Sequence, residues 1–215
     1  MKVYEHNDYN KYVSIQKNHA AEHVELLKKQ FGTDGFKLLD GDALGWVKKE
    51  YLDRIFTKLQ GYLNSNIVNP TMICHGVRCG YEAKYFMDRF GVDSVYSTDL
   101  ADVFMFDRKH FFVQDFDKLP KEWVSKFDVL YSNVIDHSRQ PKVTLKNWSL
   151  QIKDGGVMVV TFGVGDKVND CDCFVLKSVD EVATLIEGTN LSILGYCDDY
   201  PMSAVDVYFR KEKAL

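Results

Sequence analysis

Residues 71–82 constrain the fold of this chain more than any other stretch. They begin with a short apolar run that stops at Gly76, carry a second glycine at Gly80, and lead into a segment of helical composition. A strand, a glycine-bearing turn and a helix N-terminus in this order are typical of a nucleotide-type cofactor loop in a doubly wound α/β sheet. The loop therefore predicts a fold class and a kind of ligand, and the segments around it discriminate between ligands.

The composition indicates an ordinary soluble globular protein. The 215 residues are 46% hydrophobic and 27% charged, which suits one large domain or a domain with an added helical piece. The net charge of −4 lacks the basic excess of a general nucleic-acid binder, so nucleic acid is not expected as a partner. Without a signal-peptide core or an apolar run of ~20 residues, the chain is expected to be cytoplasmic and to have no membrane partner. The oligomeric state stays open.

The five cysteines form no recognisable framework. Their number is odd and their spacing contains no Cys-x-x-Cys pair. Cys171 and Cys173 flank Asp172 and offer two thiols to a metal, but no histidine lies near them in the sequence. A coincidence of loop composition explains them better, so we expect reduced thiols and no metal site.

Residues 1–68 are expected to form an N-terminal helical cap outside the sheet. Helices are predicted over residues 12–31 and 43–63, the second from apolar side chains that recur at spacings of three and four. The cap is expected either to pack as a layer or to close over a cleft as a lid. In the second case Tyr12 and Gln16 are the candidates for contact with a ligand.

From residue 71 onward the pattern predicts alternating strands and helices. Helices are expected over residues 80–90, from Pro141 to the glycines after Asp154, and from the capping box at Ser178 to Gly188. The last two strands have a short connection and should be antiparallel. The predicted strands cover residues 71–74, 94–98, 110–114, 128–132, 157–162, 191–197 and 204–210.

This arrangement resembles the class I S-adenosylmethionine-dependent methyltransferase family over residues 69–211. The resemblance implies an α/β fold with a doubly wound, mostly parallel seven-stranded sheet whose last strand is antiparallel. It also implies a Rossmann-like domain over residues 69–215, with S-adenosyl-L-methionine as cofactor. The expected activity is transfer of a methyl group to a small-molecule, sugar or metabolite acceptor.

The glycine loop favours this cofactor over a dinucleotide. Arg78 and Tyr81 stand where a G-x-G-x-x-G fingerprint needs glycine, which disfavours a pyrophosphate and a nicotinamide-dependent oxidoreductase. The methyltransferase loop needs chiefly its first and last glycines, Gly76 and Gly80, and backbone groups at the helix start can meet the cofactor carboxylate. Arg78 is expected to pair that carboxylate, and Glu82 to receive the ammonium or to hold Arg78. The alternative is a solvent-facing ion pair between Arg78 and Glu82.

Two further motifs follow predicted strands. Asp99 lies where the family's acidic residue accepts hydrogen bonds from both ribose hydroxyls, with Leu100 beside it at the cofactor. The alternative for Asp99 is an N-cap of the segment that begins at Ala101. Asp115 matches the carboxylate that binds the adenine amino group, and Phe116 matches the residue that borders the ring. An ordinary turn aspartate is the alternative for Asp115.

The fourth motif carries the candidate catalytic residues. Asn133 is expected to line the cofactor, and Asp136 with His137 matches an acidic–histidine pair at the cleft of small-molecule methyltransferases. His137 is the candidate general base, because an unperturbed imidazole takes up protons near neutral pH; the alternative is a histidine that packs on adenosine or caps the next segment. Cys74 replaces the acidic residue usual in the family, so a catalytically silent domain that binds a ligand or partner is the alternative function. His75, inside the loop, fits a structural role equally well.

Overall fold

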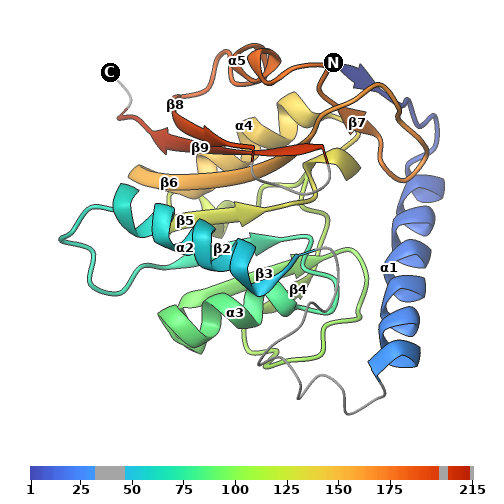
Figure 1. The fold of residues 1–215 in the computed structure, drawn as a ribbon, viewed down its shortest axis with the longest axis horizontal. Helices are drawn as coiled ribbons and strands as arrows, with labels where there is room; N and C mark the ends of the chain where they lie inside the picture. Colours follow the sequence, from blue (N-terminus) through green and yellow to red (C-terminus); the bar gives the residue numbers. More distant parts are fainter. Residues whose placement is uncertain (32–46, 199–202, 214–215) are drawn as a thin grey trace.

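The computed structural model describes residues 1–31, 47–198 and 203–213. Its centre is a seven-stranded sheet in the order β4-β3-β2-β5-β6-β9-β8 (Figure 1). Strands β2 to β6 are parallel, whereas β9 runs antiparallel to both of its neighbours, β6 and β8. This confirms the predicted fold class, including the inserted last strand. The strands are β2 (Met72–His75), β3 (Val95–Asp99), β4 (Phe111–Val113), β5 (Phe127–Ser132), β6 (Ile152–Gly163), β8 (Leu191–Cys197) and β9 (Ala204–Lys211).

The buried strand residues divide between two hydrophobic clusters, one on each face of the sheet. In β6, Val157 and Val159 belong to the first cluster, whereas Met158 and Val160 belong to the second. Side chains that follow one another along a strand point to opposite faces, so an uninterrupted apolar run supplies both clusters. The apolar run predicted at residues 157–162 is therefore a central strand buried on both faces.

Helices cover both faces of this sheet. α2 (Lys49–Tyr62) and α3 (Tyr81–Phe90) contribute to the first cluster, and α4 (Pro141–Gln151) contributes to the second (Figure 1). The helix predicted over residues 43–63 is present from Lys49, and residues 43–46 lie outside the described residues. α2 shares its cluster with the sheet and α3, so it packs as a layer. The division into residues 1–68 and 69–215 stays a prediction.

Three connections depart from a strict alternation of strands and helices. Residues 100–110, between β3 and β4, form bends and turns in which Phe104 stacks on Phe111. Residues 114–126, between β4 and β5, contain only the 3-10 turn η3 (Lys121–Trp123). Neither segment has an amphipathic repeat, and Trp123 of the second packs edge-on against Phe112 and Phe127 of the sheet. The helix predicted from Ser178 to Gly188 is shorter, because it comprises a 3-10 turn followed by α5 (Val182–Leu185).

A small second sheet, which no sequence pattern predicts, positions the N-terminal helix. β1 (Lys2–Val3) pairs antiparallel with β7 (Phe174–Val175). α1 (Tyr9–Phe31) starts shortly after β1 and runs past the carboxyl ends of the parallel strands (Figure 1). Within the three described ranges, no helix has both the length and the apolar character needed to cross a membrane.

Candidate functional site

Two glycines with positive φ shape the loop after β2. Gly76 has a φ of +70°, and a Cβ at this position would lie 2.2 Å from a methyl carbon of Val134. Gly80 has a φ of +95°, and its Cβ would lie 2.2 Å from the ring of Phe104. Any other residue would combine backbone strain with a steric clash, so both positions require glycine.

Asp99 ends β3 and holds the glycine loop. One carboxylate oxygen accepts the Arg78 N–H at 2.7 Å, and the other accepts the Ala101 N–H at 2.8 Å. The bond to Ala101 is the cap contact considered as the alternative role, yet the carboxylate also lines a cleft. Burial raises the pKa of Asp99, and the two backbone hydrogen bonds oppose this shift. Asp99 can therefore cap the segment that begins at Ala101 and still present its carboxylate to a ligand in the cleft.

The cleft lies at the carboxyl ends of the parallel strands and gathers residues that are distant in the sequence. Six of the residues predicted from the motifs line it, and Gln16, predicted as a lid contact, lines it as well. The six are Gly76, Arg78, Asp99, Leu100, Phe116 and His137. The remaining lining residues are Gln16, His19 and Ala20 of α1, together with Val134. His19, Ala20 and Val134 were missed. The sequence does contain a pattern that marks the face of α1 toward the cleft, because polar residues recur there every three or four positions. They are Tyr9, Tyr12, Gln16, His19 and His23.

Arg78 and His137 form the central polar pair of the cleft. The guanidinium donates to His137 Nε2 at 3.1 Å. Because arginine only donates, Nε2 must accept, and the imidazole proton is assigned to Nδ1. Nδ1 then donates to the backbone carbonyl of Cys171 at 3.0 Å. His137 therefore has the hydrogen bonds of a neutral imidazole in one defined tautomer, with its basic nitrogen turned toward the cleft.

Glu82 pairs with Asn133 and not with Arg78. The Asn133 amide donates to Glu82 Oε1 at 3.1 Å, and burial raises the pKa of Glu82. Both Arg78 and Glu82 are in the described part of the chain, and no ion pair joins them. The alternative of a solvent-facing ion pair is therefore wrong, since helical spacing at a turn does not ensure that two side chains meet.

Hydrogen bonds hold α1 over the cleft. The Tyr9 hydroxyl donates to Asp115 at 2.6 Å, and the Tyr12 hydroxyl donates to the backbone carbonyl of His137 at 3.0 Å. Gln16 donates to a backbone carbonyl of the segment before β7 at 2.8 Å. Burial, with the neighbouring Asp115 carboxylate, raises the pKa of Tyr9 to about 12. These contacts place α1 where a lid would lie; movement of this helix stays a prediction.

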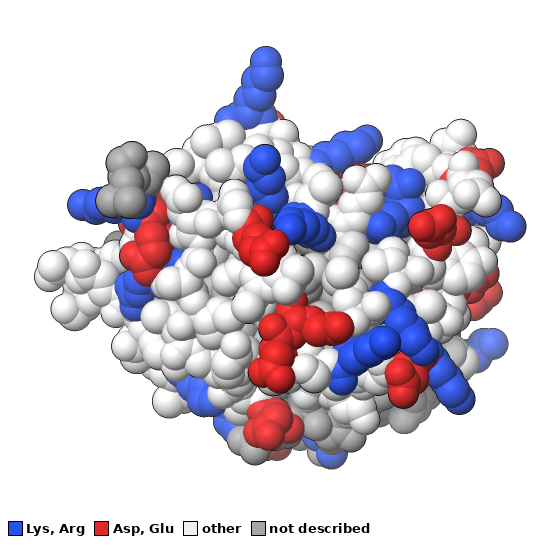
Figure 2. All heavy atoms as spheres, turned by 90° about the horizontal axis from the view of Figure 1, so that it is seen from above, with Lys and Arg blue, Asp and Glu red and all other residues white. Residues whose placement is uncertain are grey.

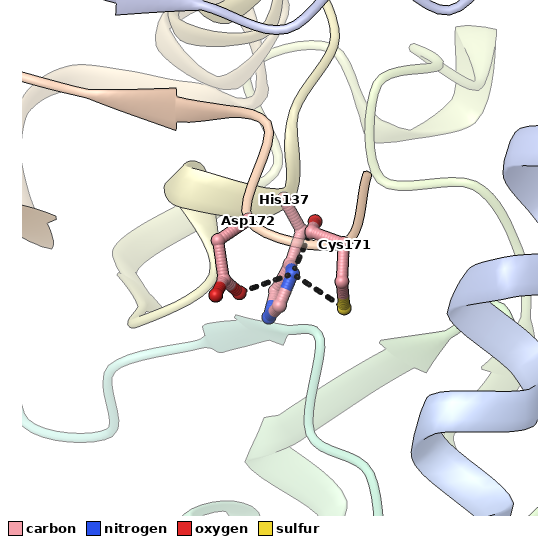
Figure 3. Close-up of side chains that lie close together, drawn as sticks. All are labelled: His137, Cys171 and Asp172. Carbon is pink, nitrogen blue, oxygen red and sulfur yellow. Dashed lines mark hydrogen bonds and ion pairs between the residues drawn. The ribbon is translucent and has the colours of Figure 1, made fainter. Parts of the chain in front are cut away.

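Two carboxylates and a thiol surround His137, and Figure 3 shows the thiol of Cys171 and the carboxylate of Asp172 beside its ring. Cys171 Sγ lies 3.7 Å from Nδ1, and an Asp172 oxygen lies 3.6 Å from the same nitrogen. Asp136 Oδ1 lies 3.9 Å from Nε2, is buried, and has no hydrogen-bond partner among the described residues. No histidine lies near Cys171 and Cys173 in the sequence, but in the folded structure His137 lies beside Cys171. The expectation that these cysteines have no histidine near them is therefore wrong.

His75 belongs to the core and not to the cleft. Its ring stacks on Trp148 at a centroid distance of 5.2 Å, and its nitrogens contact Thr98 Oγ1 at 2.8 Å and Gln151 Oε1 at 3.0 Å. Burial lowers the pKa of His75 to about 3. The structural interpretation of this histidine is therefore the one that the geometry supports.

Lowering the pH from 6.5 toward 4 is expected to destabilise the protein through His75. In this window the unfolded chain binds a proton that the folded chain excludes, so the free energy of unfolding falls as the pH falls. The contribution is up to about 1.4 kcal/mol per pH unit, and it vanishes above the unfolded pKa. Urea unfolding at several pH values would measure it. In His75→Gln the free energy of unfolding should depend less steeply on pH, by the amount that corresponds to about one proton. Equal slopes in the two proteins would contradict the lowered pKa of His75.

Comparisons with known proteins identify the fold. No protein-family model matches the chain, and no curated protein matches it. A 1,6-didemethyltoxoflavin-N1-methyltransferase from Burkholderia thailandensis, solved with S-adenosylhomocysteine, aligns with a TM-score of 0.61 and 13% identity over 90% of this chain and 91% of that chain. An S-adenosylmethionine-dependent methyltransferase from Clostridium acetobutylicum aligns with a TM-score of 0.58 and 15% identity over 84% and 96%. The chain has the class I S-adenosylmethionine-dependent methyltransferase fold.

The same fold also carries other chemistry. The [4+2]-cyclase SpnF aligns with a TM-score of 0.61 and 14% identity, over 81% of this chain and 85% of that chain. Since one fold serves both a methyltransferase and a cyclase, the reaction has to be argued from the site.

Proposed function

We propose that this protein is an S-adenosylmethionine-dependent methyltransferase acting on a small-molecule, sugar or metabolite acceptor. The observation that carries the proposal is the convergence of Gly76, Asp99, Phe116 and His137, from separate segments, on one cleft. These are the positions at which the resembled family holds its cofactor. The net charge of −4 supports a small acceptor over nucleic acid, and acidic and basic side chains are interspersed on the one face drawn in Figure 2.

The residues present fit this cofactor by their chemistry. Asp99 offers two carboxylate oxygens to the ribose hydroxyls, and Asp115 offers another carboxylate to the adenine amino group. Leu100 and Phe116 provide apolar surface for the ring. Arg78 supplies a donor for the amino-acid carboxylate, a pairing that is charge-assisted. Glu82, together with Asn133, is proposed to receive the ammonium group.

Arg78 is proposed to exchange partners when the cofactor binds. In the structure its guanidinium covers His137 Nε2. When Arg78 turns to the cofactor carboxylate, the lone pair of Nε2 becomes free to accept a proton from an acceptor hydroxyl, and Asp136 lies close enough to favour the charged ring. The cofactor supplies an electrophilic methyl group. The chain contributes positioning and exclusion of water, and a base is required only for a hydroxyl acceptor.

Calorimetry with S-adenosylhomocysteine tests the proposed cofactor. One-to-one binding in the micromolar range is expected, whereas NADH should produce no thermal shift, because Arg78 and Tyr81 obstruct a pyrophosphate. Absence of binding at millimolar S-adenosylhomocysteine would overturn the proposal. Binding without turnover on any acceptor of a broad panel would instead support the catalytically silent domain.

A further inference from the structure

We propose that His137, Cys171 and Asp172 bind a divalent transition-metal ion of the zinc type. His137 ends the 3-10 turn η4 (Ile135–His137), and the other two residues lie in the segment before β7. Nδ1, Sγ and one carboxylate oxygen all lie within 4.8 Å of one another (Figure 3). The combination of imidazole, thiolate and carboxylate favours Zn²⁺ over Mg²⁺ or Ca²⁺, which prefer oxygen ligands alone. This inference does not depend on the proposed cofactor.

The two distances from His137 Nδ1 to the other donor atoms are close to those of a tetrahedral zinc site. Zinc bond lengths of about 2.0–2.3 Å with tetrahedral angles place neighbouring ligand atoms roughly 3.4–3.6 Å apart. Nδ1 of His137 lies 3.7 Å from Cys171 Sγ and 3.6 Å from an Asp172 oxygen. Gln16 Oε1 lies 3.7 Å from the same sulfur and offers a protein donor for a fourth position. Closing the site breaks the hydrogen bond from Nδ1 to the Cys171 carbonyl, which keeps the Gln16 amide as a donor.

The segment that carries two of the ligands is held by Asn169. Its side-chain oxygen accepts the N–H groups of Cys171 and Asp172, each at 2.7 Å, and its amide donates to the second Asp172 oxygen at 3.0 Å. These bonds fix the backbone of both ligands and orient the carboxylate. Support of a ligating carboxylate by a further hydrogen bond is a usual property of metal sites.

Asp136 gives an independent indication that His137 has a second state. Its Oδ1 is buried without a hydrogen-bond partner among the described residues, and it lies 3.9 Å from Nε2, which now accepts from Arg78. A metal on Nδ1 would displace the proton there, so the neutral ring would carry its proton on Nε2. Nε2 would then donate to Asp136, in the carboxylate–histidine–metal arrangement. The orphaned oxygen gains a partner, and Arg78 loses its acceptor and is released into the cleft.

The two states of His137 exclude each other. With a metal on Nδ1 and a proton on Nε2, the ring is a ligand and cannot act as a general base. A metal-bound protein therefore suits an acceptor that needs no deprotonation by His137, while the proposed cofactor contacts remain as before.

Metal titration of the metal-stripped full-length protein tests the site. Zn²⁺ is expected to bind one-to-one by calorimetry, and Co²⁺ to give the absorption of a tetrahedral site with a thiolate charge-transfer band. Cys171→Ser should abolish that band and weaken Zn²⁺ binding by at least about 100-fold, and Asp172→Asn should weaken it by about tenfold. Asp170→Asn, which removes the same charge at an exposed position two residues earlier, should leave affinity within about twofold.

Two further measurements test whether His137 and Cys171 are the metal ligands. Cys173→Ser should retain Zn²⁺ binding. The Cys173 thiol lies 3.3 Å from His6 Nε2, so these two residues are the competing site. Loss of binding only in Cys173→Ser would place the metal there and overturn the proposal. Nitrogen–proton correlation spectra of the wild-type protein should show the His137 proton moving from Nδ1 to Nε2 on addition of Zn²⁺. Absence of stoichiometric binding, or an unchanged tautomer at saturation, would also overturn it.

Discussion

Replacing Asp99 by alanine is expected to weaken the binding of S-adenosylhomocysteine by at least about 100-fold, or roughly 2.7 kcal/mol. In the proposed site the carboxylate accepts two hydrogen bonds from the ribose, and each hydrogen bond to a charged group contributes about 1.5–3 kcal/mol. The side chain is buried, so water cannot replace the lost acceptor well. Calorimetry on the wild type and the variant measures the effect.

Asp99 also holds the backbone N–H groups of Arg78 and Ala101, so part of any loss comes from a looser loop. Asp99→Asn keeps the shape and one acceptor oxygen, and should fall between the wild type and Asp99→Ala in affinity. Urea unfolding of both variants separates loss of stability from loss of binding. Asp93→Asn, at an exposed acid that pairs with Lys109, serves as the control. Wild-type affinity in Asp99→Ala would show that the ribose assignment is wrong.

Replacing Gly76 by alanine is expected to lower the free energy of unfolding by about 2–4 kcal/mol, because two unfavourable effects add. The φ of +70° is a conformation that residues with a Cβ rarely adopt. The new Cβ would also lie 2.2 Å from a methyl carbon of Val134, next to the strand end that leads to His137. Urea unfolding of the variant measures the loss.

Gly61→Ala is the matched control for Gly76→Ala. Gly61 lies in α2, has no positive φ, and leaves open space within 4 Å of the point where a Cβ would stand, so alanine there should stabilise by about 0.5–1 kcal/mol. The double variant Gly76→Ala with Val134→Ala removes the clash but not the backbone strain. If the clash contributes, the double variant should recover part of the loss. A Gly76→Ala protein as stable as the wild type would contradict the geometry.

The sheet could be predicted because its signals are local. An apolar run such as residues 157–162 predicts a strand buried on both faces wherever the chain places it. The positions of Gly76 and Asp99 followed from the same logic, since the carboxyl ends of parallel strands meet at one edge. Strict alternation of strands and helices fails between β3 and β5, because neither connection there has an amphipathic repeat.

The contacts inside the cleft could not be predicted in this way. Arg78 meets His137 and not Glu82, because the positive φ of Arg78 at the turn breaks the helical spacing on which the expected pair depended. Cys171 reaches His137 across 34 positions, and Gln16 reaches the backbone of Cys171 across 155. A sequence pattern that extends over a few residues cannot predict contacts between residues so far apart in the chain.

The sequence by itself determined the class of fold, the glycine turn and the strand ends at which polar side chains gather, because each depends on backbone preferences and periodicity within a few residues. The tertiary structure alone decided that α1 covers the cleft, which tautomer His137 adopts, and that Asp136, Cys171 and Asp172 surround its ring. These features depend on the β1–β7 pairing and on the Asn169 turn, which bring distant segments together. Their energies come from contacts that exist only after the chain has folded.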